Sequence, residues 1–167
     1  PVEGGTPDDT RLVIKNVDPK NFLDSMKSAL HEGGHGLYIQ GLPTKGGKGY
    51  QPVCFDLGTT IHESQALFVE MILGRTPEFF KFLAPRLEGL FHTVRDPSLT
   101  AGNLHRIKTR VRPSIDRKSA DELTYFFHIF LRFKIECDLI EGKMEVADIP
   151  AFWTEWMHDN LSVMPQS

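Results

Sequence analysis

Two histidines four residues apart, with an acid beside the first, are the side chains in this sequence best suited to chemistry. His31, Glu32 and His35 lie in the stretch ALHEGGHGLY. On a helix, residues i and i+4 lie about 40° apart around the axis, so both imidazoles can bind one metal ion. Glu32 lies beside the pair, where it can accept a proton from water without being a ligand. The spacing predicts a catalytic zinc site, and the alternative is two surface histidines on a helix.

A catalytic zinc site needs a third protein ligand and an open fourth position. An extended pattern with a third histidine would require glycine at 38 and histidine at 41, but the chain has Tyr38 and Gly41. The next candidate is Glu63, in the stretch TTIHESQALFVE of a second predicted helix. From the residues alone, two alternatives stay open: Glu63 is a solvated acid, or His62 turns inward in its place.

Three glycines next to the histidines need an explanation, because each costs roughly 1 kcal/mol against alanine inside a helix. They are Gly33, Gly34 and Gly36. Glycine allows another backbone to approach closely. We therefore expect a second chain segment or a substrate to pass near this helix, and the bound metal to hold the helix together.

The elements that must position these residues are mostly helical. Apolar periodicity and end signals predict helices over 19–40, from Asp56 or Thr60 to Gly74, and over 76–91, 123–142 and 149–161. Thr76 and Pro77 open the third of these, and a capping box at 119–122 precedes the fourth. Residues 10–17 predict a short edge strand, and 43–52 a loop. The expected fold is mainly α, a zincin-like helical segment with a small β element near the metal site.

The long helix predicted at 123–142 carries one histidine and several phenylalanines. We expect His128 to be a core histidine with its hydrogen bonds satisfied, rather than a ligand. Phe126, Phe127 and Phe130 are expected to pack in the core.

Composition excludes several classes of protein. The chain has 167 residues, of which 40% are hydrophobic and 25% charged, with a net charge of -3, which suits one globular domain. The charge gives no footprint for nucleic acid or an anionic membrane. Cys54 and Cys137 form no metal motif, so a reducing compartment fits, although one disulfide between them stays open. Without an apolar span or a leader pattern, we expect an intracellular, cytoplasmic protein.

The chain ends carry two interpretations of equal weight. The sequence opens on PVEGGTPDD and closes on LSVMPQS. These ends fit a piece of a longer protein, or a processed small protein with loose termini.

The motifs together resemble the carboxypeptidase Taq family of zinc metallocarboxypeptidases, whose zinc motifs are H-E-x-x-H and H-E-S-Q. Both are intact here, at 31–35 and 62–65. The resemblance implies that Glu63 is the third ligand. Two further family motifs match in part: D-x-R-x-T resembles residues 9–13, and I-R-x-x-A-D resembles residues 116–121. Each keeps its arginine, and the resemblance extends over nearly the whole chain.

Some positions depart from the family pattern. Val13 replaces a threonine and Asp116 an isoleucine, which affects the surroundings of both arginines. The closing family motif G-x-x-Q-D-x-H-W is absent, and family members are longer on the N-terminal side. The chain therefore resembles a single catalytic, zinc-binding segment, 1–167, of such an enzyme.

The function that these features predict is release of single amino acids from the C-termini of peptides. Glu32 would be the base, with Arg117, then Arg11, as candidates to bind the substrate carboxylate through a bidentate fork. The resemblance implies zinc or cobalt, and a homodimer for the full-length enzyme. Two alternatives stay open: an endopeptidase or aminopeptidase using the same site, and an inactive metal-binding module. We expect the 167 residues alone to hold zinc, to associate, and to be inactive or nearly so.

Overall fold

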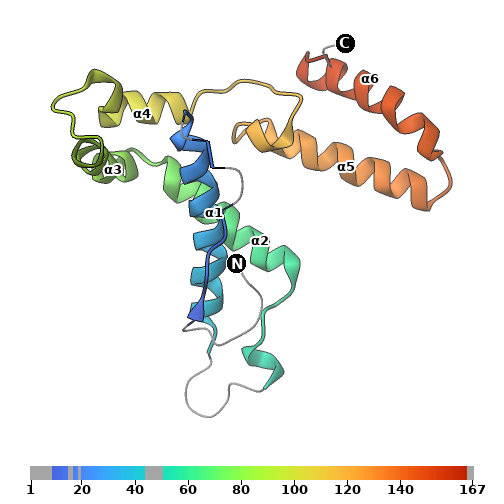
Figure 1. Cartoon of the computed structure of the whole chain (residues 1–167). Coiled ribbons are helices and arrows are strands. Elements are labelled where there is room, and N and C mark those ends of the chain that lie inside the picture. The colour runs from blue at the N-terminus through green and yellow to red at the C-terminus, as the bar shows by residue number, and fades with distance from the viewer. Residues whose placement is uncertain (1–8, 15–16, 19, 44–50, 165–167) are drawn as a thin grey trace. The chain divides into compact units, whose positions relative to one another are not determined.

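The computed structural model describes residues 9–14, 17–18, 20–43 and 51–164. The α-helices in these ranges are α1 (Phe22–Gly41), α2 (Thr59–Leu67), α3 (Pro77–Leu90), α4 (Ala101–Lys108), α5 (Tyr125–Ile140) and α6 (Ile149–Leu161), as Figure 1 shows. Short 3₁₀ turns lie at Pro52–Cys54, Leu73–Arg75, Pro97–Leu99, Arg117–Ser119 and Val146–Asp148. The mainly α class is confirmed. The chain forms two compact units, unit 1 (Pro1–His105) and unit 2 (Arg106–Ser167).

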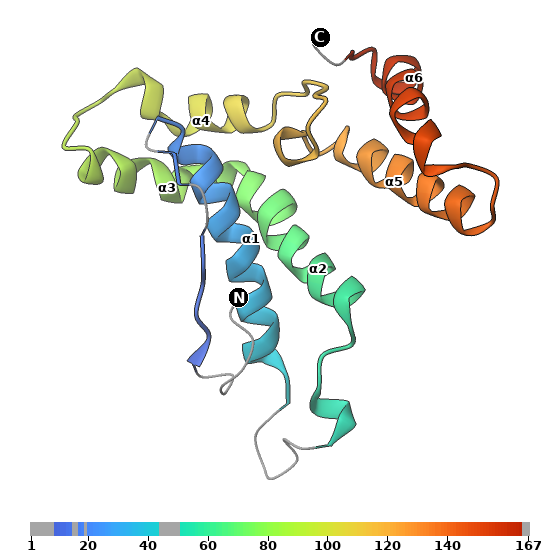
Figure 2. The same cartoon turned by 45° about the vertical axis from the view of Figure 1, so that its right-hand side comes forward.

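In unit 1, α1 and α2 lie side by side, as both Figure 1 and Figure 2 show. The two helices approach closely at Gly34, where an added Cβ would lie 2.6 Å from the Cα of Ala66 and 2.9 Å from the carbonyl oxygen of Gln65. Glycine is therefore required at this position, and the expected close passage of a second segment is confirmed here. At Gly33, by contrast, an added Cβ would meet nothing within 4 Å.

The second predicted helix is not one regular α-helix. α2 ends at Leu67 and continues into a π-helical turn, Phe68–Ile72, and then a 3₁₀ turn that ends at Arg75. A π turn widens the helix and is frequent at functional sites. It contains Glu70, which is buried and faces α1.

The helix α3 begins as its sequence predicts. Thr76 precedes Pro77, and its hydroxyl oxygen accepts a hydrogen bond from the backbone N–H of Phe79 at 3.1 Å. The buried face of α3 packs against residues of the following turns and of α4, a helix that the sequence did not predict. The core of unit 1 consists of Phe80, Ala84, Leu87, Leu99 and Leu104.

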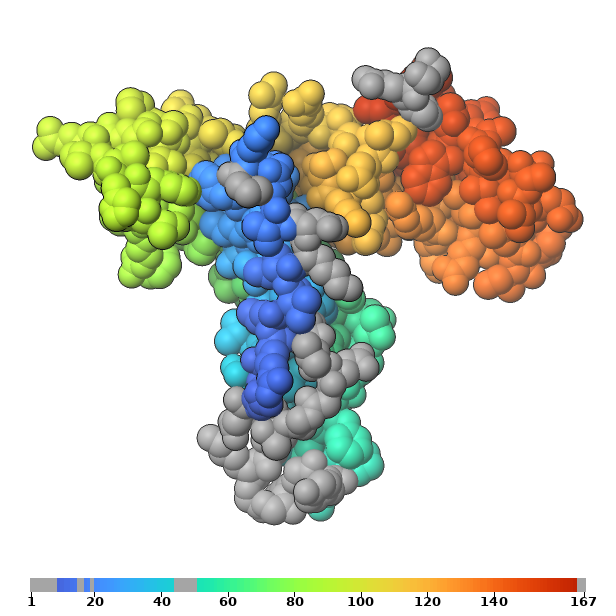
Figure 3. Space-filling model, in the orientation of Figure 1, coloured from blue at the N-terminus to red at the C-terminus, as the bar shows by residue number. Residues whose placement is uncertain are grey.

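The strand predicted at 10–17 is not present in the described part of that range, 10–14 and 17. An edge strand requires a partner strand, and this segment instead lies against a helix. The side chains of Thr10 and Leu12 contact the surface of α1 at Gly36, where an added Cβ would come within 2.9 Å of Thr10. Figure 3 shows this blue segment lying over α1. The predicted small β element is therefore not seen among the residues that the structure describes. Most of the loop predicted at 43–52 lies outside the described residues.

Unit 2 is built on the pair α5 and α6, whose core consists of Leu131, Ile135, Met157 and Leu161. The bounds of α6 agree with the prediction. The capping box predicted at 119–122 is wrong, because the hydroxyl of Ser119 bonds to the carbonyl of Asp116. Asp121 takes over this role: its carboxylate accepts the backbone N–H groups of Leu123 and Thr124, each at 2.9 Å. It also accepts the backbone N–H of Arg112 at 2.8 Å, which ties the preceding segment to the start of α5.

The phenylalanines of α5 do not lie in the core. Phe126 is 71% exposed, Phe127 42% and Phe130 65%, so that prediction was wrong. α6 packs on the face of α5 that carries Leu131 and Ile135, and the ring centroid of Phe127 lies 6.2 Å from that of Trp156 in α6. His128 is fully buried, as predicted. Neither ring nitrogen meets strict hydrogen-bond geometry, although a backbone group of Ser114 opposes the lowering of the His128 pKa that burial causes.

Two further properties bear on the sequence-based expectations. Among the described residues, no helix combines the length and apolar character needed to cross a membrane. Neither Cys54 nor Cys137 forms a disulfide within the part of the chain that the structure describes.

Candidate metal centre

Three potential ligands come together where α1 faces α2. His31 and His35 project from α1 and Glu63 from α2, and one ligand atom from each lies within 4.8 Å of the other two. His35 is buried, His31 is half-buried and Glu63 is exposed. We call these three residues the metal centre.

The distances within the metal centre fit metal coordination better than hydrogen bonding. Nε2 of His31 lies 3.5 Å from Glu63 Oε2, and Nε2 of His35 lies 3.6 Å from Glu63 Oε1. Direct N–H···O hydrogen bonds would be about 2.7–3.2 Å long. Ligands about 2.1 Å from a tetrahedral zinc ion are separated from one another by about 3.4 Å. Two imidazoles and a carboxylate also form a known ligand set of catalytic zinc, so the residues fit a divalent ion.

The other ring nitrogen of His31 is bound by a buried carboxylate. Nδ1 of His31 lies 2.8 Å from Oε2 of Glu70, and the ammonium of Lys27 lies 3.3 Å from Oε1 of the same residue. Burial alone would raise the pKa of Glu70. The hydrogen bond from His31 and the charge of Lys27 outweigh burial and hold this pKa below its ordinary value.

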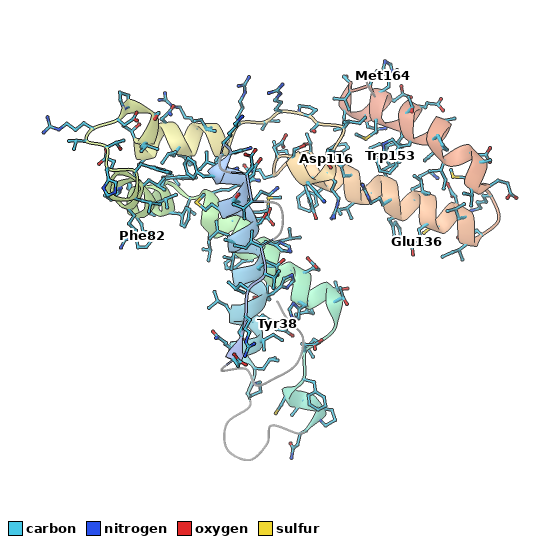
Figure 4. The ribbon with its side chains drawn as sticks, viewed as in Figure 1. Tyr38, Phe82, Asp116, Glu136, Trp153 and Met164 are labelled. Atoms are coloured by element: carbon cyan, nitrogen blue, oxygen red, sulfur yellow. The ribbon has the colours of Figure 1, made fainter. Side chains whose placement is uncertain are left out.

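The other ring nitrogen of His35 is bound by a second imidazole. Nδ1 of His35 and Nδ1 of His62 are in hydrogen-bond contact. The ring of Tyr38, labelled in Figure 4, packs edge-on against His62 with centroids 5.1 Å apart. The hydroxyl oxygen of Tyr38 accepts the backbone N–H of Leu57 at 2.9 Å, which connects the segment before α2 to α1.

The two histidines have different electrostatic surroundings. The hydrogen bond to Glu70 is the main cause that raises the pKa of His31, with the charges of Glu63 and Glu32 adding to it. The pKa of His35 is lowered, chiefly because burial disfavours the charged imidazolium. Burial thus favours the neutral form of His35, which is the form that a metal ligand requires, while the contact with Glu70 makes His31 the more basic imidazole.

The predicted substrate arginines have different partners. Both Nε and a terminal nitrogen of Arg11 donate to the carboxylate of Asp9, at 3.0 and 2.8 Å, in the exposed N-terminal segment. Arg117 belongs to unit 2, where one terminal nitrogen donates to the hydroxyl of Tyr125 at 3.0 Å. Arg11 is therefore already engaged by a carboxylate, and Arg117 by a neutral group.

Sequence reasoning missed Glu70 and Lys27, and considered His62 only as a rival ligand. A signal for the first two was present: Glu70 lies seven residues after Glu63, and Lys27 lies four residues before His31. Both spacings place the paired side chains on one face of a helix.

Comparison with known proteins connects this geometry to a family. The model of the carboxypeptidase Taq (M32) metallopeptidase family matches residues 1–167. Thermostable carboxypeptidase 1 of Thermus thermophilus is 34% identical over 160 residues, covering 96% of this chain and 30% of the relative. Carboxypeptidase 1 of Bacillus subtilis is 30% identical over 155 residues, covering 93% and 30%.

Solved structures of relatives have the same fold over this segment. Trypanosoma cruzi metallocarboxypeptidase 1 matches with a TM-score of 0.76 and 41% identity, over 84% of this chain and 27% of that one. The M32 carboxypeptidase of Deinococcus radiodurans R1 matches with a TM-score of 0.78 and 29% identity, over 91% and 30%. This chain thus spans less than a third of the length of these relatives. The resemblance noted in the zinc motifs is confirmed: the chain belongs to the carboxypeptidase Taq (M32) metallopeptidase family.

Proposed function

We propose that this chain forms the metal-binding part of a metallocarboxypeptidase that releases single amino acids from peptide C-termini. The observation that supports this most is the convergence of His31, His35 and Glu63 at the spacing of metal ligands, in a chain of this family. His31 and His35 would bind the ion through Nε2, and Glu63 through its carboxylate. Zinc is the expected ion, and cobalt is the alternative.

The ion and one neighbouring acid would divide the chemistry. A bound divalent ion supplies Lewis acidity, which polarises a carbonyl and lowers the pKa of a water molecule towards about 7. Glu32 follows His31 on α1, and its charge already acts on the pKa of His31. Its carboxylate accepts the proton of the attacking water and returns it to the leaving amine.

A carboxypeptidase must also recognise the free carboxylate of its substrate. Arg117 is the first candidate, because its contact with Tyr125 is to a neutral hydroxyl. For Arg11 to bind a peptide carboxylate, it would first have to release Asp9. The order Arg117, then Arg11, is therefore retained.

Metal analysis tests the centre directly. After mild chelation the chain should retain one zinc ion, and Glu63→Ala should lose it. His92, an exposed histidine in the same unit, provides the control: His92→Asn should keep the zinc. Retention of a full equivalent of zinc by Glu63→Ala would show that Glu63 is not a ligand.

Activity is tested in a longer protein, because the chain spans less than a third of its relatives. Alone, it should bind zinc with little or no turnover. A chimera in which it replaces the matching 160 residues of the Thermus thermophilus relative should release C-terminal amino acids. The same peptides with a C-terminal amide should resist the chimera. Cleavage of the amides at an equal rate would favour the endopeptidase or aminopeptidase alternative, and a zinc-loaded, inactive chimera would favour the inactive module.

We further propose that copies of this chain associate through α5. Its exposed face carries Phe126, Phe130, Phe133 and Ile140, spaced three, four and seven residues apart, and they are 63–79% exposed. A heptad-like row of this kind fits the same row on a second copy. Contiguous apolar patches beyond a few hundred Å² rarely stay uncovered. Light scattering should show a dimer or larger species, and Phe130→Glu should shift it towards the monomer. A monodisperse wild-type monomer would contradict the proposal.

A further inference from the structure

The two histidines of the metal centre share an unusual arrangement: both have their Nε2 towards Glu63, and both have their Nδ1 engaged by another side chain. For His31 the partner is Glu70, and for His35 it is His62. A free imidazole on a helix can rotate about its side-chain bonds and can carry its proton on either nitrogen. Here a second side chain contacts each ring at Nδ1, which restricts the orientation of the ring and leaves Nε2 towards Glu63.

Glu70 is placed for this role by burial and by the π turn. Only 6% of its surface is exposed, and both of its oxygens are occupied, one by His31 and the other by Lys27. An ionised carboxylate accepts but cannot donate, so the proton of the contact lies on Nδ1 of His31. In the neutral imidazole, Nε2 of His31 then carries the lone pair that faces Glu63.

His62 has the same effect on His35 through a neutral group. If Nε2 of His35 is to bind an ion, Nδ1 of His35 must carry the proton, and Nδ1 of His62 must accept it. The ring of His62 is held between the rings of His35 and Tyr38, with centroids 4.4 and 5.1 Å away. Tyr38 is in turn tied to the backbone of Leu57.

We propose that Glu70 and His62 are positioning residues of the metal centre, each accepting the Nδ1 proton of one histidine so that its Nε2 is presented to the ion. This inference rests on the proposed metal centre. Outer partners of metal-bound histidines typically contribute 10- to 100-fold to metal affinity. Glu70 should contribute more than His62, because its charge makes the His31 ring more basic while His62 is a neutral acceptor.

The test at His62 compares two substitutions in the 167-residue chain. His62 is only half-buried, so neither should prevent folding. His62→Asn keeps an acceptor oxygen near the position of Nδ1, whereas His62→Phe fills the space without one. Zinc affinity, measured by competition with a chromogenic chelator, should fall about tenfold or more for His62→Phe and much less for His62→Asn. His92→Asn serves as the control and should leave the affinity unchanged.

The test at Glu70 must take account of Lys27, whose partly buried ammonium faces the Glu70 carboxylate. We therefore compare Glu70→Gln, which keeps an acceptor, with the double variant Lys27→Met/Glu70→Leu, which removes both charges. The double variant should fold, as judged by a cooperative thermal transition without metal, yet bind zinc up to 100-fold more weakly. Glu70→Gln should lie between it and the wild type.

The outcomes separate this inference from the proposed function. If the wild-type chain binds no zinc, the metal centre itself is wrong. If the wild type binds zinc and both His62→Phe and the double variant bind it equally well, the positioning roles are wrong. The roles are also wrong if His62→Asn and Glu70→Gln, which keep an acceptor, lose as much zinc affinity as the variants without an acceptor. If the double variant does not fold, the zinc affinities of His62→Asn, His62→Phe and Glu70→Gln test the positioning roles.

Discussion

Replacing Gly34 by alanine should separate the two halves of the metal centre. The new Cβ would lie 2.6 Å from the Cα of Ala66 and 2.9 Å from the carbonyl oxygen of Gln65, both of which are backbone atoms that cannot rotate away. Non-bonded carbon atoms sit about 3.5–4.0 Å apart, so α2 must move away from α1 by about 1 Å. Overpacking of this kind costs about 1–3 kcal/mol.

The matched control is Gly33→Ala, on the same helix, where the new Cβ meets nothing within 4 Å. Both substitutions gain the same helix propensity, roughly 1 kcal/mol, so this gain cancels when the two variants are compared. Gly33→Ala should therefore raise the free energy of unfolding, and Gly34→Ala should fall below Gly33→Ala by about 1–3 kcal/mol. Urea unfolding of the metal-free chain, followed by circular dichroism, measures this difference.

The same movement should weaken metal binding. Glu63 moves with α2, and its oxygens start 3.5 and 3.6 Å from the two histidine nitrogens. A further 1 Å would leave the ligands too far apart for one tetrahedral ion, for which the separation is about 3.4 Å. We expect zinc affinity to fall at least tenfold in Gly34→Ala and to stay unchanged in Gly33→Ala. Equal stability and equal zinc affinity of the two variants would refute the close packing that the structure shows.

Three other predictions address the base, unit 2 and the core of unit 1. In the chimera, Glu32→Gln should keep its zinc and lose about 10²- to 10⁴-fold in turnover; activity within tenfold of the parent would remove the role of Glu32. Burial alone would raise the pKa of Asp121, but the donors that Thr124 and Arg112 direct at its carboxylate lower it. Its stabilising effect is thus present above the unfolded pKa of about 3.9 and lost as pH falls through the lower folded value. Asp121→Asn should flatten the acid limb of a stability–pH profile, and an unchanged limb would contradict this assignment. Leu104 is 2% exposed in the core of unit 1. Leu104→Ala should lower the free energy of unfolding by about 2–5 kcal/mol, measured by urea unfolding. A loss below about 1 kcal/mol would show that the neighbouring side chains fill the cavity or that Leu104 does not lie in the core.

Local sequence signals predicted the helices best where one residue determines the start. A proline restricts the backbone at the start of two helices: Pro77, which follows Thr76, in α3, and Pro150 in α6. Both helices begin as predicted. Signals that depend on a competing partner failed. Ser119 had a capping pattern, but Asp121, two residues later, accepts the N–H groups at the start of α5.

The ligands of the metal centre could be predicted, because helical spacing and a sequence motif identify them. His31 and His35 lie one turn apart, and Glu63 stands in a recognisable motif, so the three could be named without coordinates. For the outer partners the sequence offers only helical spacing, which does not show that their side chains reach the histidines, because this depends on how α2 is aligned against α1 and on a π turn that leaves no propensity signal. The exposed face of α5 was misjudged for a related reason. Periodicity shows which side chains share a face, but not which face another helix covers.

The division of the metal centre between two helices has a consequence for folding. An ion held by His35 and Glu63 would join residues 28 positions apart, counted as 63 minus 35, and would act as a cross-link. By the loop-closure relation for cross-links, restricting the unfolded chain over this distance is worth about 3–4 kcal/mol. That relation is logarithmic, so doubling the intervening segment changes the closure term by only about 0.6 kcal/mol. We therefore expect the number of residues between the two zinc motifs to vary among relatives at little energetic cost. At Gly34, by contrast, the close contact with Ala66 leaves no room for a larger residue.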